Sequence, residues 1–167
     1  MGLGSQRNRS SDILFVMDFQ VLFRRCTNSV REVIDMDTVA APQIVDVQWQ
    51  LVEIETPGAR IQITATDGDA TIRFTREPHA EVENASRFSG NTGCNTFEGA
   101  YQISGDRTLS VISLHPTERY CGDRAFEIEQ VYLAALSTMT SYEVQIDQLR
   151  LYSEDQQRII TFQKAPQ

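Results

Sequence analysis

The feature that most constrains the fold is a segment rich in glycine and asparagine, residues 88–101, which reads Phe-Ser-Gly-Asn-Thr-Gly-Cys-Asn-Thr-Phe-Glu-Gly-Ala-Tyr. Glycine and asparagine adopt backbone angles that other residues avoid, so residues 90–95 are predicted to form a tight loop with positive-φ positions. The flanking residues 85–89 and 96–103 are predicted to be short strands. The segment is therefore expected to be two strands joined by a specialised turn.

Apolar and polar residues alternate along most of the chain from Val45 onward, which is the pattern of half-buried strands. Val47, Trp49 and Leu51 face one way, and the glutamines between them face the other. Further alternating stretches, separated by turn-forming residues, lie at 60–64, 70–75, 101–104, 109–114, 142–146, 149–152 and 159–162. With a single helix before the last three, this order predicts an α+β fold. We expect a strongly bent antiparallel sheet or open barrel of about eight strands, with one helix packed across it.

One helix is predicted after Asp123, which is a suitable N-cap residue, and Glu127 near its start suits the helix dipole. At about 100° per residue, its apolar arc comprises Ala125, Phe126, Ile128, Val131, Tyr132, Leu133, Ala135 and Leu136. Glu129 falls inside this arc, where a carboxylate is costly unless it is hydrogen-bonded or paired. Glu129 is therefore predicted to accept backbone N–H groups from residues 90–95 or to pair with Arg119. The functional alternative is an acid with a raised pKa in a pocket.

The chain has 167 residues, which suits one domain with extra residues at one end, and its hydrophobic content of 41% supports a core. The domain is predicted to span residues 45–164, after an N-terminal extension of residues 1–44. Six aromatic residues are assigned to the core of this domain: Trp49, Phe74, Phe88, Phe97, Tyr101 and Phe162.

The N-terminal extension begins with polar residues rich in arginine and serine, so we expect it to be partly disordered. Residues 13–23 form an apolar run that suits a short helix. Asp18 and Gln20 interrupt this run, which is too short to cross a hydrocarbon core of about 30 Å. Arg24 and Arg25 stand where a lipidation site needs small residues before its cysteine. No membrane span, signal peptide or lipidation site is therefore predicted.

The formal net charge is −8, and it is unevenly placed. Residues 1–35 contain five arginines against four acidic residues, a balance of +1, so the remaining residues carry −9. A nucleic-acid-binding surface needs clustered positive charge. The balance therefore argues against a nucleic-acid partner.

Three residues suggest chemistry: Cys94, Cys121 and His115. Cys94 on a glycine-rich turn with His115 as its base would make a nucleophilic pair, but the local signatures of cysteine proteases are absent. The three together could ligate zinc, but the usual close spacing of zinc ligands is missing. No Lys-Ser or Lys-Thr pair follows Gly93, as a phosphate-binding loop requires. We therefore predict no catalytic residue, cofactor or metal.

Two states are open for Cys94 and Cys121: a disulfide, or two reduced and buried cysteines. A disulfide between them would add about 3.5 kcal/mol to the stability in the chain-entropy estimate. In both states their sulfur atoms are predicted to lie close together, because the glycine-rich turn and the start of the helix organise the same end of the domain.

Together these motifs resemble the META domain, the HslJ-like heat-shock protein family. The resemblance covers about residues 45–162. It is carried by Trp49-Gln50-Leu51, by the Gly90-x-x-Gly93-Cys94-Asn95-x-Phe97-x-Gly99-x-Tyr101 core, by Thr117 and Cys121, by Glu129, Tyr132, Leu133 and Leu136 in the helix, and by Tyr142. The residues marked as structural are Trp49, Gly90, Gly93, Cys94, Asn95, Phe97, Gly99, Tyr101, Cys121 and Glu129.

The resemblance implies a bacterial, non-enzymatic binding or structural module that is associated with stress or with the cell envelope. Its expected partner is another protein, or a small apolar ligand held in the barrel. A lipocalin-like carrier of such a ligand is the alternative, and a cysteine-dependent enzyme is a further one. Many members of the family carry a lipoprotein signal, so the envelope is the expected location. Because residues 1–44 show no such signal, the cytoplasm is the alternative location.

Overall fold

The computed structural model describes residues 44–166. The predicted extension of residues 1–44, with its apolar run at residues 13–23, lies outside the described residues except for Ile44. The described chain contains one helix and a 9-stranded sheet. The elements are β1 (Gln48–Thr56), β2 (Ala59–Gln62), β3 (Ala70–Pro78), β4 (Ser86–Thr92), β5 (Thr96–Ser104), β6 (Thr108–Pro116), α1 (Asp123–Leu136), β7 (Met139–Gln145), β8 (Gln148–Ser153) and β9 (Ile159–Lys164).

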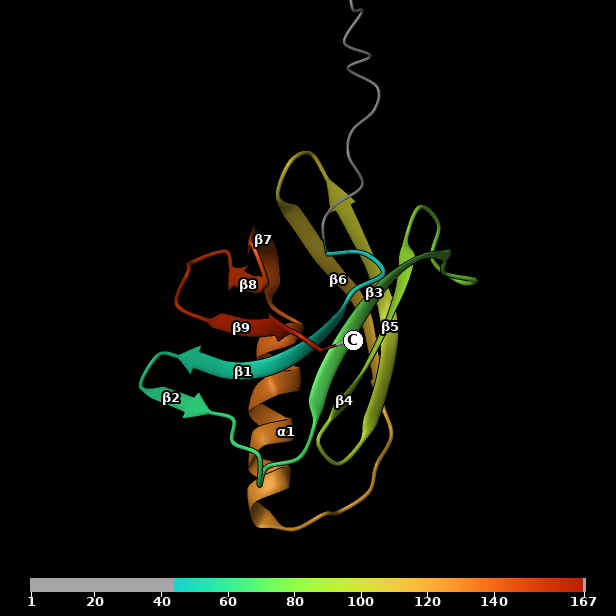
Figure 1. The fold of residues 1–167 in the computed structure, drawn as a ribbon. Coiled ribbons are helices and arrows are strands. Elements are labelled where there is room, and N and C mark those ends of the chain that lie inside the picture. The colour runs from blue at the N-terminus through green and yellow to red at the C-terminus, as the bar shows by residue number, and fades with distance from the viewer. Residues whose placement is uncertain (1–43, 167) are drawn as a thin grey trace, which may run out of the picture. The chain divides into compact units, whose positions relative to one another are not determined.

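The strands form one antiparallel sheet that closes on itself into a barrel (Figure 1). Their order is β2-β1-β3-β4-β5-β6-β7-β8-β9, and β1 also pairs with β9, from Trp49↔Lys164 to Glu55↔Ile159. Because β2 pairs only with the second half of β1, it is an extra strand, and the other eight strands make up the barrel. The predicted α+β fold of about eight strands and one helix is confirmed.

The barrel has its shortest strand ladder between β6 and β7. This ladder has a single Cα pair, Thr108↔Ser141, beside a backbone bond from the Tyr142 N–H to the Arg107 carbonyl (3.0 Å). The helix α1 connects these two strands in sequence, and it packs against β1, β4 and β9. In Figure 1 it stands behind β1 and β9. From Ser110 onward, β6 is therefore paired on one side only among the described residues.

Packed side chains fill the interior of the barrel. The six aromatic residues assigned to the core from the sequence are at most 3% exposed, which confirms that assignment. The helix adds Tyr132, whose ring centroid lies 5.7 Å from that of Phe97 and 6.1 Å from that of Phe162. Trp49 donates its indole N–H to the Ile44 carbonyl (3.1 Å), which ties the first described residue to the barrel.

The glycine-rich segment differs from the loop predicted for residues 90–95. The strand β4 continues to Thr92, so the turn is shorter than predicted. Within residues 90–95, Gly93 alone has a positive φ, at 92°. The prediction of several positive-φ positions is therefore wrong, because Gly90, Asn91 and Thr92 belong to β4 and only Gly93 needs such an angle.

Two glycines of the motif are required by packing instead of by backbone angle. A Cβ atom on Gly90 would overlap the Phe97 ring and the Thr71 carbonyl oxygen of the neighbouring strands. A Cβ atom on Gly99 would likewise overlap the Ser113 carbonyl oxygen and the Phe88 ring. Each glycine thus leaves room for an aromatic ring of the adjacent strand, and that ring covers the backbone.

The helix lies where it is predicted, but its first turn differs from the prediction. Gly122, with φ 102°, occupies the N-cap position without a side-chain cap, because glycine tolerates this backbone angle. Asp123 lies in the first turn, where its carboxylate accepts the Tyr120 hydroxyl. Phe126 is predicted in the apolar arc, yet it is 50% exposed. It lies at the edge of that arc, and its ring pairs outside the core with Tyr120, at 6.5 Å between centroids.

Candidate functional site

A buried carboxylate lies at the centre of the glycine-rich motif. Glu129 is on the inner face of α1 and is 6% exposed. Its Oε2 atom accepts one hydrogen bond from the Thr92 hydroxyl (2.6 Å) and one from the Asn95 amide (2.9 Å). The donors predicted for Glu129, which were backbone N–H groups or Arg119, are therefore wrong. Nothing in the sequence marks Thr92 for this role, because threonine is a common residue in strands.

Asn95 links the helix to the residues that precede it. Its amide also donates to the Arg119 carbonyl (2.9 Å), and its Oδ1 atom accepts the Thr117 hydroxyl (3.1 Å). Its backbone N–H donates to the Thr92 hydroxyl oxygen (2.9 Å). The turn after β4, the segment before α1 and α1 itself therefore share one hydrogen-bond network.

Cys94 and Cys121 form a disulfide, with Cα atoms 5.8 Å apart. This confirms that their sulfur atoms lie together and selects the disulfide over two reduced cysteines. The Arg119 guanidinium donates to the Cys94 carbonyl (2.8 Å), so a covalent link and a polar link join the same two segments. A disulfide-bonded Cys94 has no thiolate, which leaves the nucleophile and zinc hypotheses without support. His115 lies in β6, opposite Glu98.

The loop between β2 and β3 packs against the motif, a contact that sequence reasoning missed. A Cβ atom on Gly93 would lie 2.6 Å from the Asp67 carbonyl oxygen. The Asp67 carboxylate accepts the Thr64 hydroxyl (2.7 Å) and the Thr64 N–H (2.8 Å), and it pairs with Arg124 of α1 (3.3 Å). The Thr64 donors, and after them Arg124, lower the pKa of Asp67. The Asp67-Gly68 pair signals a turn, but nothing in the sequence identifies its partner.

An open cleft of about 410 Å³ lies between α1 and the segment that precedes it. Its lining includes Pro116, Arg119, Tyr120, Phe126, Gln130 and Leu133, with Asn95 and Glu129 among the polar groups. Two aromatic residues of this lining are largely exposed, Tyr120 at 68% and Phe126 at 50%. Exposed aromatic residues that gather at a hollow mark a binding surface more often than scattered apolar residues do.

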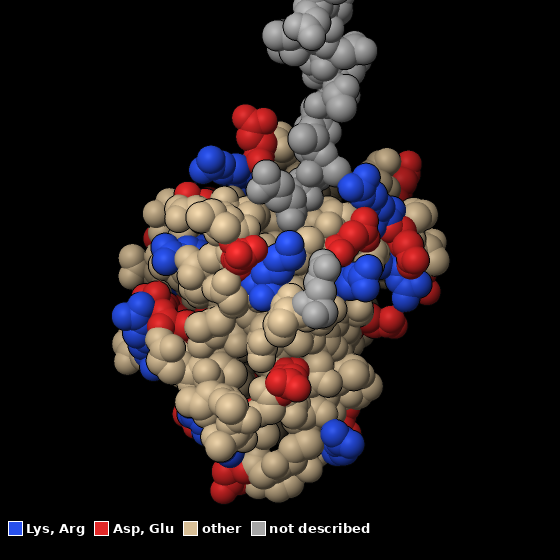
Figure 2. All heavy atoms as spheres, in the orientation of Figure 1, with Lys and Arg blue, Asp and Glu red and all other residues tan. Residues whose placement is uncertain are grey.

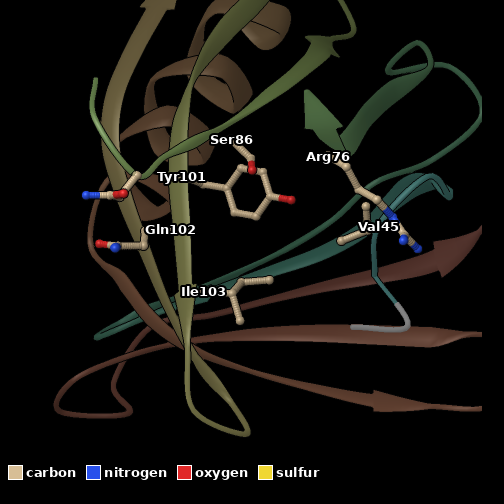
Figure 3. A pocket seen from close by; sticks show the side chains of 7 residues that line it. Val45, Arg76, Ser86, Tyr101, Gln102 and Ile103 are labelled. Carbon is tan, nitrogen blue, oxygen red and sulfur yellow. The ribbon is translucent and has the colours of Figure 1, made fainter. Parts of the chain in front are cut away.

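A second hollow, of about 300 Å³, is lined mainly by residues of β3, β4 and β5 (Figure 3). The Tyr101 hydroxyl beside it donates to the Thr75 carbonyl (2.8 Å), and burial raises the pKa of Tyr101 to about 12. Arg76 at its rim pairs with Asp46 (3.3 Å). These polar groups already have partners within the chain, so we assign no ligand to this hollow.

On the face shown in Figure 2, Lys and Arg side chains stand among Asp and Glu side chains. Within residues 44–166, no group of three or more His, Cys, Asp or Glu side chains could hold a metal ion. The helix of this part of the chain is not long and apolar enough to cross a membrane.

The fold and the motif define a class of small proteins, namely closed β-barrels with one helix bound to a disulfide-linked Gly-Cys-Asn turn. The model of the META domain matches residues 42–166, so this chain belongs to the META-domain family. The family resemblance drawn from the sequence is thereby confirmed.

Two solved structures are similar to this chain. One is an NMR structure of a protein from Burkholderia xenovorans, with 23% identity and a TM-score of 0.59, over 74% of this chain and 85% of that chain. The other is also an NMR structure, with 20% identity and a TM-score of 0.51, over 72% of this chain and 91% of that chain. At these identities the similarity shows the fold alone. No curated protein matches the chain.

Proposed function

We propose that this META-domain protein is a non-enzymatic binding module that recognises a partner protein at the cleft between residues 116–122 and α1. The observation that carries the proposal is the pair of exposed aromatic rings, Tyr120 and Phe126, 6.5 Å apart at that cleft. Aromatic side chains are enriched at protein interfaces, where they supply a large contact area at little cost in conformational entropy. The family resemblance adds an association with stress or with the cell envelope to this proposal.

The segment that carries Tyr120 is held in place before any partner binds. The disulfide between Cys94 and Cys121 fixes the end of the segment. The Arg119 carbonyl accepts the Asn95 amide, and the Arg119 guanidinium donates to the Cys94 carbonyl. A binding surface that is already ordered loses less conformational entropy on association. The buried network thus supports a binding role, because it orders the binding surface, and no catalytic role is needed to explain the network.

The alternative of a lipocalin-like carrier has less support. A carrier needs an interior cavity for its ligand. Packed side chains occupy the interior of this barrel, and Tyr132 of α1 reaches Phe97 and Phe162. The cleft beside α1 includes a buried carboxylate and a guanidinium in its lining. An open cleft whose lining mixes these polar groups with Tyr120, Phe126 and Leu133 suits the side chains of a partner protein.

Photo-crosslinking tests the proposal. Benzoylphenylalanine is placed at Tyr120 of the full chain, and at Ile146 as the control, in cells of the source organism. Ile146 is 94% exposed between β7 and β8 and does not line the cleft. We expect one discrete crosslinked product from position 120, reduced by Phe126→Ala, and no product of that mass from position 146. The same products from both positions, or none from position 120, would contradict the proposal.

A further inference from the structure

The strand β6 has a free edge beside the cleft. β5 pairs with β6 from Thr108 to Pro116 except at Ile112, where the register shifts, whereas β7 pairs with β6 at Thr108↔Ser141. Among residues 44–166, no other strand pairs with residues 110–116. An unpaired strand edge presents N–H and C=O groups that can form a ladder with another strand.

The ladder with β5 shows which groups of β6 face the free edge. The Thr117 N–H donates to the Thr96 carbonyl (2.8 Å), so this pair is hydrogen-bonded. Hydrogen-bonded and non-hydrogen-bonded pairs alternate along antiparallel strands. The Glu98↔His115 pair lies two residues before the pair of Thr117 and is therefore also hydrogen-bonded, whereas the Gly99↔Leu114 pair is not. The N–H and C=O groups of Leu114 thus point away from β5, toward the free edge.

Apolar side chains accompany this edge and continue into the cleft. Ile112 is 46% exposed, and Val111 and Leu114 are partly buried against the core. Where β6 ends, Pro116 and Leu133 of α1 line the cleft together. An extended peptide on this edge would find hydrogen-bonding groups for its backbone and apolar contacts for alternate side chains.

The charges near the cleft favour a basic partner. Glu118 and Glu129 line the cleft, whereas Glu127, exposed on α1 outside the lining, pairs with Arg124 (3.4 Å). Arg119 also lines the cleft, so the lining carries an excess of one negative charge, from Glu118 and Glu129 against Arg119. The chain beyond residue 35 carries −9, since residues 1–35 hold +1 of the total of −8. Positive charge on the partner would therefore be complementary.

We propose that an extended segment of the partner protein, with alternating apolar and basic residues, adds as a strand to β6 between Ser110 and Pro116. One of its apolar side chains enters the cleft beside Tyr120 and Phe126. This inference rests on the proposed function, because it specifies the part of the partner that the cleft recognises. Pro116 has no N–H group, so the strand addition ends there.

Peptide titration followed by NMR tests strand addition. The full chain is labelled with nitrogen-15 and titrated with three synthetic peptides, which alternate valine with lysine, with glutamate or with serine. We expect the lysine peptide to shift the amide resonances of residues 110–117 saturably, and the glutamate peptide to bind several-fold more weakly. Shifts confined to other residues, or no shifts with any of the three peptides, would overturn the proposal.

Removal of N–H groups separates strand pairing from side-chain binding. Two isomers of the lysine peptide carry N-methyl groups on alternate residues, one on the valines and the other on the lysines. Because only one edge of an added strand faces β6, only one of these two sets of N–H groups would pair with it. One isomer is expected to lose binding while the other keeps it, and equal binding of both would refute strand addition. In the protein, Leu114→Pro removes an N–H group that does not pair with β5. We expect this variant to bind the lysine peptide about fivefold more weakly. The N-methyl isomers decide the question if this variant does not fold.

The outcomes distinguish the inference from the proposed function. A crosslinked partner at position 120, together with peptides that leave β6 unchanged, would refute strand addition and leave the proposed function standing. Peptide binding at β6 without a crosslinked partner at position 120 would refute the proposed function. Shifts of residues 110–117 that follow protein concentration alone would identify a second copy of the chain as the occupant and overturn the proposal.

Discussion

Replacing Glu129 by glutamine tests whether the buried carboxylate holds the motif together. Its Oε2 atom accepts both the Thr92 hydroxyl and the Asn95 amide. Thr92 cannot reverse its hydrogen bond, because its oxygen already accepts the N–H groups of Cys94 (3.3 Å) and Asn95 (2.9 Å). A glutamine must therefore place its oxygen at this position. Its amino group then lies where Oε1 is, 3.1 Å from the Asn95 amide nitrogen.

Three contributions set the size of the effect. Hydrogen bonds to a charged group contribute about 1.5–3 kcal/mol and neutral ones about 0.5–1.5 kcal/mol, so two bonds together lose about 2–3 kcal/mol. A buried amino group that faces another donor costs about 1–3 kcal/mol more. A neutral amide is easier to bury than a carboxylate, which offsets part of this cost. We expect Glu129→Gln to lower the free energy of unfolding by about 2–4 kcal/mol.

Urea unfolding of the oxidised full chain, followed by the fluorescence of Trp49, measures this loss. The matched control is Glu127→Gln in the same helix, where the carboxylate is 62% exposed and lies 3.4 Å from Arg124. Exposed pairs of this kind contribute little, so the control should change the free energy of unfolding by less than about 0.5 kcal/mol. Equal and small losses in both variants would refute the reasoning, since they would place Glu129 in solvent.

Three further predictions follow from the core, the disulfide and the β2–β3 loop. Trp49→Ala should cost about 3–5 kcal/mol in urea unfolding, as truncation of a buried aromatic does, and a loss below about 1 kcal/mol would contradict its burial. Reduction of the bond between Cys94 and Cys121 should cost about 3.5 kcal/mol, seen as a lower urea midpoint with dithiothreitol, and an unchanged midpoint would show that the bond does not stabilise the fold. The Thr64 donors hold the pKa of Asp67 below its ordinary value. Asp67 therefore contributes stability above its unfolded-state pKa, and this contribution is lost as the pH falls through its folded-state pKa. NMR titration of the carboxyl group should show the lowered pKa, and Asp67→Asn should remove this part of the acid dependence of unfolding.

Burial could be predicted from the sequence because it depends on local geometry. Side chains alternate across a strand and repeat every three to four residues on a helix, so the pattern alone placed Trp49 and Glu129 on buried faces. Hydrogen-bond partners depend on tertiary contacts instead. Thr92 lies 37 residues from Glu129 in sequence, and Asp67 lies 57 residues from Arg124. No periodic pattern connects residues so far apart, so these donors could not be predicted.

Gly90 and Phe126 show two other limits of the sequence. The composition around Gly90 suggested special backbone angles, whereas the true reason is the space taken by the Thr71 carbonyl and the Phe97 ring on the two neighbouring strands. That reason requires the alignment of two strands, which composition does not contain. Phe126 stands at the edge of the apolar arc, where the periodic pattern does not separate a buried ring from an exposed one that pairs with Tyr120.

The two glycine–ring contacts also decide how β4 and β5 align. In the native hairpin Phe88 lies opposite Gly99, and Gly90 lies opposite Phe97. A slip by two residues in one direction would set the two phenylalanines against each other, and a slip in the other direction would set the two glycines opposite each other and leave a hole. Both slips keep the same side chains inward, so apolar patterning alone would not reject them. The reciprocal exchange of ring and glycine therefore selects the one alignment that brings Asn95 to the helix.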